Sequence, residues 1–128
     1  MYTEKITLSN GVQAPQLGLG TWFIEDAAAA EAVRVAAKLG YRHFDTAQAY
    51  GNERGVGEGV RTCGIPREEL FVVSKVAAEH KTYESAKVSI DETLTKMGLD
   101  HLDMMIIHSP QPWDKVNQCE DRYVEGNR

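Results

Sequence analysis

Short apolar stretches along the chain alternate with longer segments in which apolar residues recur every three or four positions. The short stretches are typical of buried strands, and the longer segments of helices that pack one face on a sheet. The predicted strands are residues 17–20, 42–45, 71–76 and 104–107. Because the last stretch is continuously apolar, it predicts a strand buried on both faces, as in a parallel sheet.

Three amphipathic helices are predicted between these strands, over residues 25–39, 52–62 and 82–97. A glycine at position 40, 64 or 98 follows each of them, where it suits a helix C-terminal cap. The expected buried face of the first helix comprises Ala32, Val33, Ala36 and Leu39. That of the third comprises Tyr83, Ala86, Ile90, Leu94 and Met97.

A β-hairpin is predicted before the first of these strands. Polar and apolar residues alternate from Lys5 to Leu8, Asn10-Gly11 follows, and Val12 resumes the pattern. Asn-Gly favours a type I′ turn, in which both central residues have positive φ.

The alternation of strands and helices indicates an α/β fold, because each strand start follows the previous one at the length of a βαβ unit. Two architectures fit this alternation, an open doubly wound sheet and a (β/α)₈ barrel. Periodicity does not distinguish them.

Composition narrows the class of protein. The net charge of −5 disfavours a nucleic-acid partner. No apolar run reaches the roughly 20 residues that a membrane span requires, and the first residues lack the apolar core of a signal peptide. The two cysteines, Cys63 and Cys119, have no metal-ligand spacing and favour a reducing compartment. We therefore expect a cytoplasmic protein with no membrane partner and no metal site.

Four side chains with useful chemistry lie at or just after the predicted strands: Asp45, Tyr50, Lys75 and His108. In a parallel α/β sheet the carboxyl ends of the strands form one rim, where reactive groups gather. An acid, a phenol, an amine and an imidazole are therefore expected together.

This combination suits the reduction of a carbonyl group. Hydride addition leaves an alkoxide that needs a proton, and a tyrosine can donate one if a nearby ammonium stabilises its phenolate. Lys75 supplies an ammonium and Asp45 a carboxylate to hold it, while His108 can polarise the carbonyl oxygen. Lys75 also lies in an apolar run, where an unpaired ammonium is costly.

Each residue alone has an ordinary structural interpretation. Tyr50 could be a packing residue, and Lys75 could extend to solvent. Asp45 could cap a helix, and His108 could be a hydrogen-bonded core histidine. The combination on one rim favours the catalytic interpretation.

The chain resembles the aldo-keto reductase family in specific motifs. Residues 40–47, followed after five residues by Glu53, Val56 and Gly57, match the spacing of the family signature. Leu19-Gly20-Thr21-Trp22 resembles the loop after the family's first strand. Ser74-Lys75 resembles its lysine segment, and Ile106-Ile107-His108 resembles its histidine segment. Residues 108–113 are similar to bacterial reductases of the 2,5-diketogluconate reductase type.

The resemblance implies a (β/α)₈ barrel with an N-terminal hairpin, NADPH as cofactor, and small aldehydes or ketones as substrates. It implies Tyr50 as general acid, Lys75 and Asp45 as its tuning partners, and His108 as the residue that orients the carbonyl. Tyr50 and His108 would then also contact the substrate.

The same resemblance implies binding residues around these four. Gly20, Thr21 and Asp45 would approach the nicotinamide end of the cofactor, and Trp22 and Trp113 would be apolar walls of the substrate pocket. Core packing is the alternative for both tryptophans. The family often has an aromatic residue after its histidine, where this chain has Ser109, so the substrate range is left open.

The length of the chain departs from a complete barrel. A (β/α)₈ barrel needs about 200–250 residues, so these 128 residues hold only about the first four βα units. We expect residues 1–128 to be one incomplete domain, the N-terminal half of the barrel, without most of the family's cofactor contacts. Three alternatives follow: a piece of a longer reductase, a self-association that pairs the strand edges, or a non-catalytic half-barrel that acts as a binding or assembly module.

Overall fold

The computed structural model of the chain describes residues 3–110. Its first two strands, β1 (Lys5–Thr7) and β2 (Gln13–Pro15), form an antiparallel hairpin. The other four form a parallel sheet in chain order: β3 (Leu19–Gly20), β4 (His43–Asp45), β5 (Phe71–Val76) and β6 (Met104–Ile107). The predicted parallel α/β sheet is confirmed.

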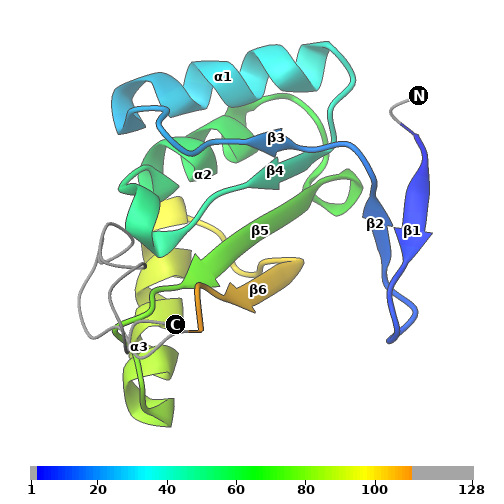
Figure 1. Cartoon of the computed structure of the whole chain (residues 1–128). Helices are drawn as coiled ribbons and strands as arrows, with labels where there is room; N and C mark the ends of the chain where they lie inside the picture. The colour runs from blue at the N-terminus through cyan, green and yellow to red at the C-terminus, as the bar shows by residue number, and fades with distance from the viewer. Residues whose placement is uncertain (1–2, 111–128) are drawn as a thin grey trace.

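Three α-helices follow the first three strands of this sheet: α1 (Asp26–Lys38), α2 (Glu53–Thr62) and α3 (Tyr83–Met97). Two single 3₁₀ turns, η1 (Gln48–Tyr50) and η2 (Arg67–Glu69), lie in the connections. All three helices cover the same side of the sheet (Figure 1). A doubly wound sheet has helices on both faces and a reversal in its strand order, so the arrangement is that of a partial barrel.

Side chains of β5 alternate between the two faces of the sheet, as the strand period of two requires. Val72 belongs to the main core, together with Phe44 of β4 and apolar residues of α1 and α2. Phe71 and Val73 point to the other face, where Ala14 of the hairpin packs against them. Lys75 has the same parity as Phe71 and Val73, so it emerges on the face that the helices do not cover.

The hairpin lies beside the end of the sheet at which the strands begin (Figure 1). Its turn differs from the prediction, because Gly11 has a φ of 86° whereas Asn10 does not have a positive φ. Leu8 N donates to Val12 O at 2.8 Å across a three-residue loop, and Leu8 O accepts from Gly11 N at 2.8 Å. Loops of this length need only one left-handed residue, which is the glycine.

Helix α3 begins and ends as the sequence predicts. The hydroxyl of Thr82 accepts a hydrogen bond from Ser85 N at 3.1 Å, and Gly98 ends the helix with a φ of 65°. Met97 is buried as expected, and Ala86, Ile90 and Leu94 are half-buried. Tyr83, also expected on this face, is 77% exposed. The buried positions are Ser89, Thr93 and Met97. Two of these are polar because they face buried polar groups of the active-site region, described below.

The outer strands were also predicted wrongly as buried. Gly20 in β3 is exposed, and Ile106 and Ile107 in β6 are exposed as well. The outer strands β3 and β6 each have a single neighbouring strand in the described sheet. One edge and part of one face of each are therefore exposed. Leu39, expected in the buried face of α1, is likewise exposed.

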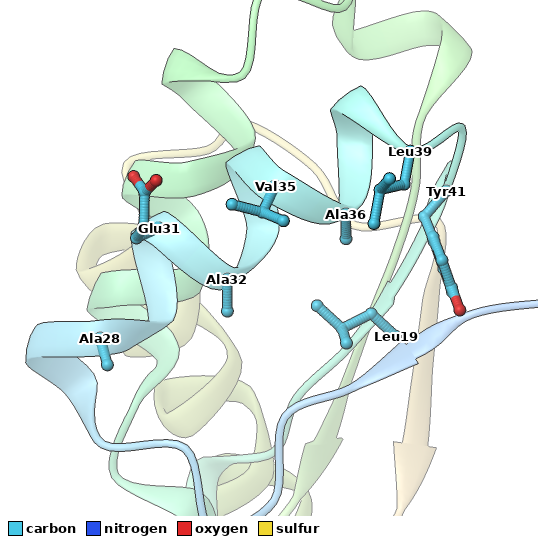
Figure 2. Close-up of a pocket in the computed structure, with 8 residues that line it drawn as sticks. All are labelled: Leu19, Ala28, Glu31, Ala32, Val35, Ala36, Leu39 and Tyr41. Carbon is cyan, nitrogen blue, oxygen red and sulfur yellow. The ribbon is translucent and has the colours of Figure 1, made fainter.

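An apolar hollow lies where α1 passes the open edge of β3. Figure 2 shows Leu19 facing helix residues across it. Its lining comprises Leu19, Ala28, Glu31, Ala32, Val35, Ala36, Leu39 and Tyr41. No helix among residues 3–110 is long and apolar enough to cross a membrane.

Replacement of Gly57 by alanine is expected to lower the free energy of unfolding by about 1–3 kcal/mol, the usual cost of overpacking. A Cβ at this position of α2 would collide with the backbone of Met97 in α3. Urea denaturation of Gly57→Ala and of the unmodified chain measures the effect. Increased stability would contradict this close approach, since alanine otherwise favours a helix over glycine.

Candidate active site

The four residues predicted at the rim come together in the structure. Asp45 ends β4, Tyr50 ends η1, Lys75 lies near the end of β5, and His108 directly follows β6. Lys75 Nζ donates to Asp45 Oδ1 at 2.6 Å and to Thr46 O at 2.8 Å. It also lies 3.3 Å from the hydroxyl of Tyr50. One ammonium therefore contacts both the carboxylate and the phenol.

The lysine is held in this position by burial as well as by charge. Its side chain is only 13% exposed, against 30% for Asp45. A buried ammonium needs compensating hydrogen bonds, and the three oxygen contacts supply them. The expectation that Lys75 has a partner is confirmed by this geometry.

His108 faces the tyrosine from the other side of the site. Its ring meets that of Tyr50 edge to face, with 5.8 Å between the ring centroids. Its backbone N–H donates to Val76 O at 2.9 Å and so continues the pairing of β5 with β6. This hydrogen bond fixes the main chain of His108, and the ring contact places its imidazole beside the phenol.

The pKa of His108 lies below its ordinary value of 6.5. Burial disfavours the imidazolium most, the charge of Lys75 disfavours it further, and the carboxylate of Asp45 partly offsets both. At neutral pH the ring is therefore uncharged, with one nitrogen able to donate a hydrogen bond to a carbonyl oxygen.

This shift makes stability depend on pH in a defined direction. As the pH falls below 6.5, the unfolded chain binds a proton at His108 before the folded chain does, so the free energy of unfolding decreases. We expect an NMR titration of the imidazole protons to give a midpoint below 6.5. His108→Gln should lose this part of the acid destabilisation. A midpoint at or above 6.5 would contradict the burial and charge effects.

Of the predicted binding residues, Trp22 and Gly20 lie beside these four side chains. Trp22 is 63% exposed and stacks on Tyr50, with 6.4 Å between the ring centroids. This exposure excludes the core-packing alternative for Trp22. Trp113 lies outside the described residues.

Thr21, another expected binding residue, is fully buried. Its hydroxyl and its backbone N–H both donate to Asp45 O, at 2.8 and 3.1 Å. Its side chain therefore fixes β3 to the end of β4, and its carbonyl accepts from Asn52 Nδ2 at 2.8 Å, so the whole residue is enclosed beneath the rim.

A buried polar network, which sequence reasoning missed, lies behind the four residues. Glu53 at the start of α2 is only 3% exposed, and its carboxylate accepts hydrogen bonds from Ser74 at 2.5 Å and Thr93 at 3.1 Å. Gln48 joins the network by donating to Thr93 at 3.2 Å and accepting from Ala77 N at 2.8 Å. The network thus ties η1, which carries Tyr50, to β5, which carries Lys75.

Removal of one hydroxyl from this network is expected to be costly. Ser74→Ala leaves the Glu53 carboxylate with Thr93 as its described hydroxyl donor. We expect the free energy of unfolding to fall by about 1–3 kcal/mol, the cost of an unsatisfied buried polar group. Thermal denaturation measures it, with Ser9→Ala in the exposed loop of the hairpin as a comparison. A change below about 0.5 kcal/mol would contradict the role of this hydrogen bond.

The residues present fit the nicotinamide end of a dinucleotide. A Cβ at Gly20 would meet nothing within 4 Å, so the rim is open there. The neighbouring Asp45 presents a partly exposed carboxylate that can accept hydrogen bonds from hydroxyl or amide groups. Within residues 3–110, His, Cys, Asp and Glu side chains form no group of three that could hold a metal.

Comparison with known proteins agrees with this geometry. The model of the aldo/keto reductase family matches residues 15–125. A 9,11-endoperoxide prostaglandin H2 reductase of Trypanosoma cruzi is 47% identical over 82% of this chain and 38% of that protein. The NADPH-dependent aldose reductase of Saccharomyces cerevisiae is 41% identical over 94% of this chain and 38% of its own length.

A solved structure of an aldo/keto reductase from Brucella melitensis superposes with a TM-score of 0.85 at 39% identity. The superposition covers 95% of this chain and 47% of the Brucella melitensis chain. The chain thus spans less than half the length of these relatives, which agrees with the partial barrel. The chain belongs to the aldo/keto reductase family.

Proposed function

We propose that the protein carrying this chain reduces aldehydes and ketones to alcohols with NADPH, with Tyr50 as the proton donor. The observation that carries the proposal is the contact of one partly buried ammonium, Lys75, with both Asp45 and the Tyr50 hydroxyl. The name of the yeast relative, an NADPH-dependent aldose reductase, supports the cofactor and the carbonyl substrate.

The reaction has a simple balance of atoms and electrons. When bound, NADPH supplies a hydride to the carbonyl carbon and becomes NADP⁺. The carbon–oxygen π bond breaks, and the oxygen takes the proton of the Tyr50 hydroxyl. Lys75 stabilises the negative charge left on the phenolate oxygen, 3.3 Å away, until a proton returns from solvent.

Each remaining side chain has a part in this proposal. Asp45 holds the Lys75 ammonium in place at 2.6 Å. His108 donates a hydrogen bond to the carbonyl oxygen and so orients it toward Tyr50. Gly20 and the carboxylate of Asp45 would hold the nicotinamide end, while the buried Thr21 fixes the main chain of Asp45. Trp22 would be an apolar wall for the substrate. Trp113 remains a predicted second wall.

A second candidate function is a non-catalytic half-barrel that binds or assembles with a partner. The open edge of β3 with its apolar hollow, and the exposed Ile106 and Ile107 on β6, favour it. The same edges would serve two copies of the chain, or the remaining half of a longer chain, in completing a barrel. In either case we expect a reducing, cytoplasmic setting.

Consumption of NADPH in the presence of glyceraldehyde separates these functions. The sample is the 128-residue chain with its intact mass confirmed at 14.2 kDa, and light scattering gives its size in solution. Turnover would support carbonyl reduction, and a dimer would then be expected to complete the site. A folded monomer that neither binds NADPH nor turns over glyceraldehyde would favour the binding module for this chain.

A further inference from the structure

Phe23 has a backbone conformation that aromatic residues rarely adopt. Its φ is 65°, in the left-handed region where a side chain crowds the backbone. Within residues 3–110, the residues other than glycine with positive φ are Phe23 and Ser109. Both follow strand ends at the rim, one after Trp22 and the other after His108. Backbone strain of this kind is common at functional sites, where the surrounding structure maintains it.

The turn itself does not require a phenylalanine. Ile24 N donates to Thr21 O at 3.0 Å, which closes a four-residue turn with Phe23 at its third position. A left-handed third position favours glycine or asparagine. Phe23 is also 84% exposed, so its ring adds little to the core. Neither the turn nor the core explains an aromatic residue here.

The ring of Phe23 instead extends a row of rings that begins at the active site. It stacks on Trp22 at 4.4 Å between centroids, with 25° between the planes. Trp22 stacks in turn on Tyr50 at 6.4 Å, and Tyr50 meets His108 at 5.8 Å. Because Phe23, Trp22 and Tyr50 are stacked, their ring edges form an apolar surface that runs outward from the phenol that donates the proton in the proposed reaction.

We propose that Phe23 is a specificity-determining residue, which favours carbonyl substrates that carry an aromatic ring over small polar aldehydes. This inference rests on the proposed function. With the carbonyl oxygen at Tyr50, a ring on the substrate would lie along Trp22 and reach Phe23. Aromatic contacts of this kind change affinity by about two- to tenfold.

Two substitutions at this position separate the ring from the turn. Phe23→Asn removes the ring and suits the left-handed turn, whereas Phe23→Tyr keeps the ring and the strain. For Phe23→Asn we expect the ratio of kcat/KM for benzaldehyde to that for glyceraldehyde to fall by about three- to tenfold. Its Tm should rise by a few degrees because strain is relieved. Phe23→Tyr should keep the original ratio and Tm. Val88→Ala, which alters an exposed apolar residue of α3, should also leave the ratio unchanged.

A binding measurement keeps the test independent of turnover. Saturation-transfer NMR with benzyl alcohol, the product of benzaldehyde reduction, reports contact of its ring with the chain. We expect a signal with the unmodified chain and Phe23→Tyr, and a much weaker one with Phe23→Asn. If no aldehyde is reduced, the proposed function fails for this chain, while this signal still decides the role of Phe23. An unchanged signal in Phe23→Asn, no signal in the unmodified chain, or a lower Tm in Phe23→Asn would overturn the inference.

Discussion

Tyr50→Phe is expected to lower kcat for aldehyde reduction by about 10²–10⁴-fold, the usual contribution of a general acid. The substitution removes the hydroxyl that lies 3.3 Å from Lys75 Nζ, while the ring that stacks on Trp22 and meets His108 remains. The dissociation constant for NADPH should therefore change by less than about twofold. Steady-state kinetics and NADPH fluorescence measure the two effects separately.

Tyr83 offers a matched control for this variant. It is an exposed tyrosine at the start of α3, and Tyr83→Phe should leave kcat unchanged. Full activity in Tyr50→Phe would exclude Tyr50 as the proton donor. A loss of NADPH binding as large as the loss of kcat would indicate that its hydroxyl serves the cofactor instead.

Lys75→Met is expected to lower kcat by about 10²-fold or more, as Tyr50→Phe does. The variant keeps the unbranched apolar stem of the side chain but removes the ammonium that contacts Asp45, Thr46 O and Tyr50. The negative charge on the Tyr50 oxygen after proton transfer is then left without its cation, so the barrier rises. Rates measured from pH 5 to pH 9 show whether any pH restores activity.

A second readout for Lys75→Met does not depend on turnover. The charge of Lys75 lowers the pKa of His108, so the midpoint of the His108 titration should rise toward 6.5 in the variant. Lys87→Met is the control, because Lys87 pairs with Asp91 on the exposed face of α3. Unchanged rates across the pH range, or an unchanged His108 midpoint, would show that the ammonium does not act on the site.

Regular elements were predictable from the chain because local patterns determine them. The apolar run 71–76 has the bounds of β5, and the segment that Thr82 caps and Gly98 ends is α3. The rim residues were predictable for a related reason. Strand ends in a parallel sheet share one edge, so Asp45, Lys75 and His108 had to meet once the strands were placed.

Other features depend on contacts between elements that periodicity does not report. Ser89 and Thr93 are buried because Gln48 and Glu53, from other elements, bond to them. The exposure of β6 depends on which strands the described sheet contains. Phe23 has a positive φ at a turn position that favours glycine or asparagine, so the sequence does not predict its left-handed conformation.

In the proposed function, NADPH bound at this rim would supply a hydride to a carbonyl carbon, and Tyr50 would donate a proton to its oxygen. Reduction of glyceraldehyde with NADPH deuterated at the transferable C4 position tests it most directly, with mass spectrometry and NMR of the alcohol. The account predicts one deuterium on the carbinol carbon with the unmodified chain. With Tyr50→Phe it predicts labelled alcohol formed about 10²–10⁴-fold more slowly. Labelled alcohol formed at the same rate by Tyr50→Phe, or no labelled alcohol from a folded chain that binds both NADPH and aldehyde, would contradict it.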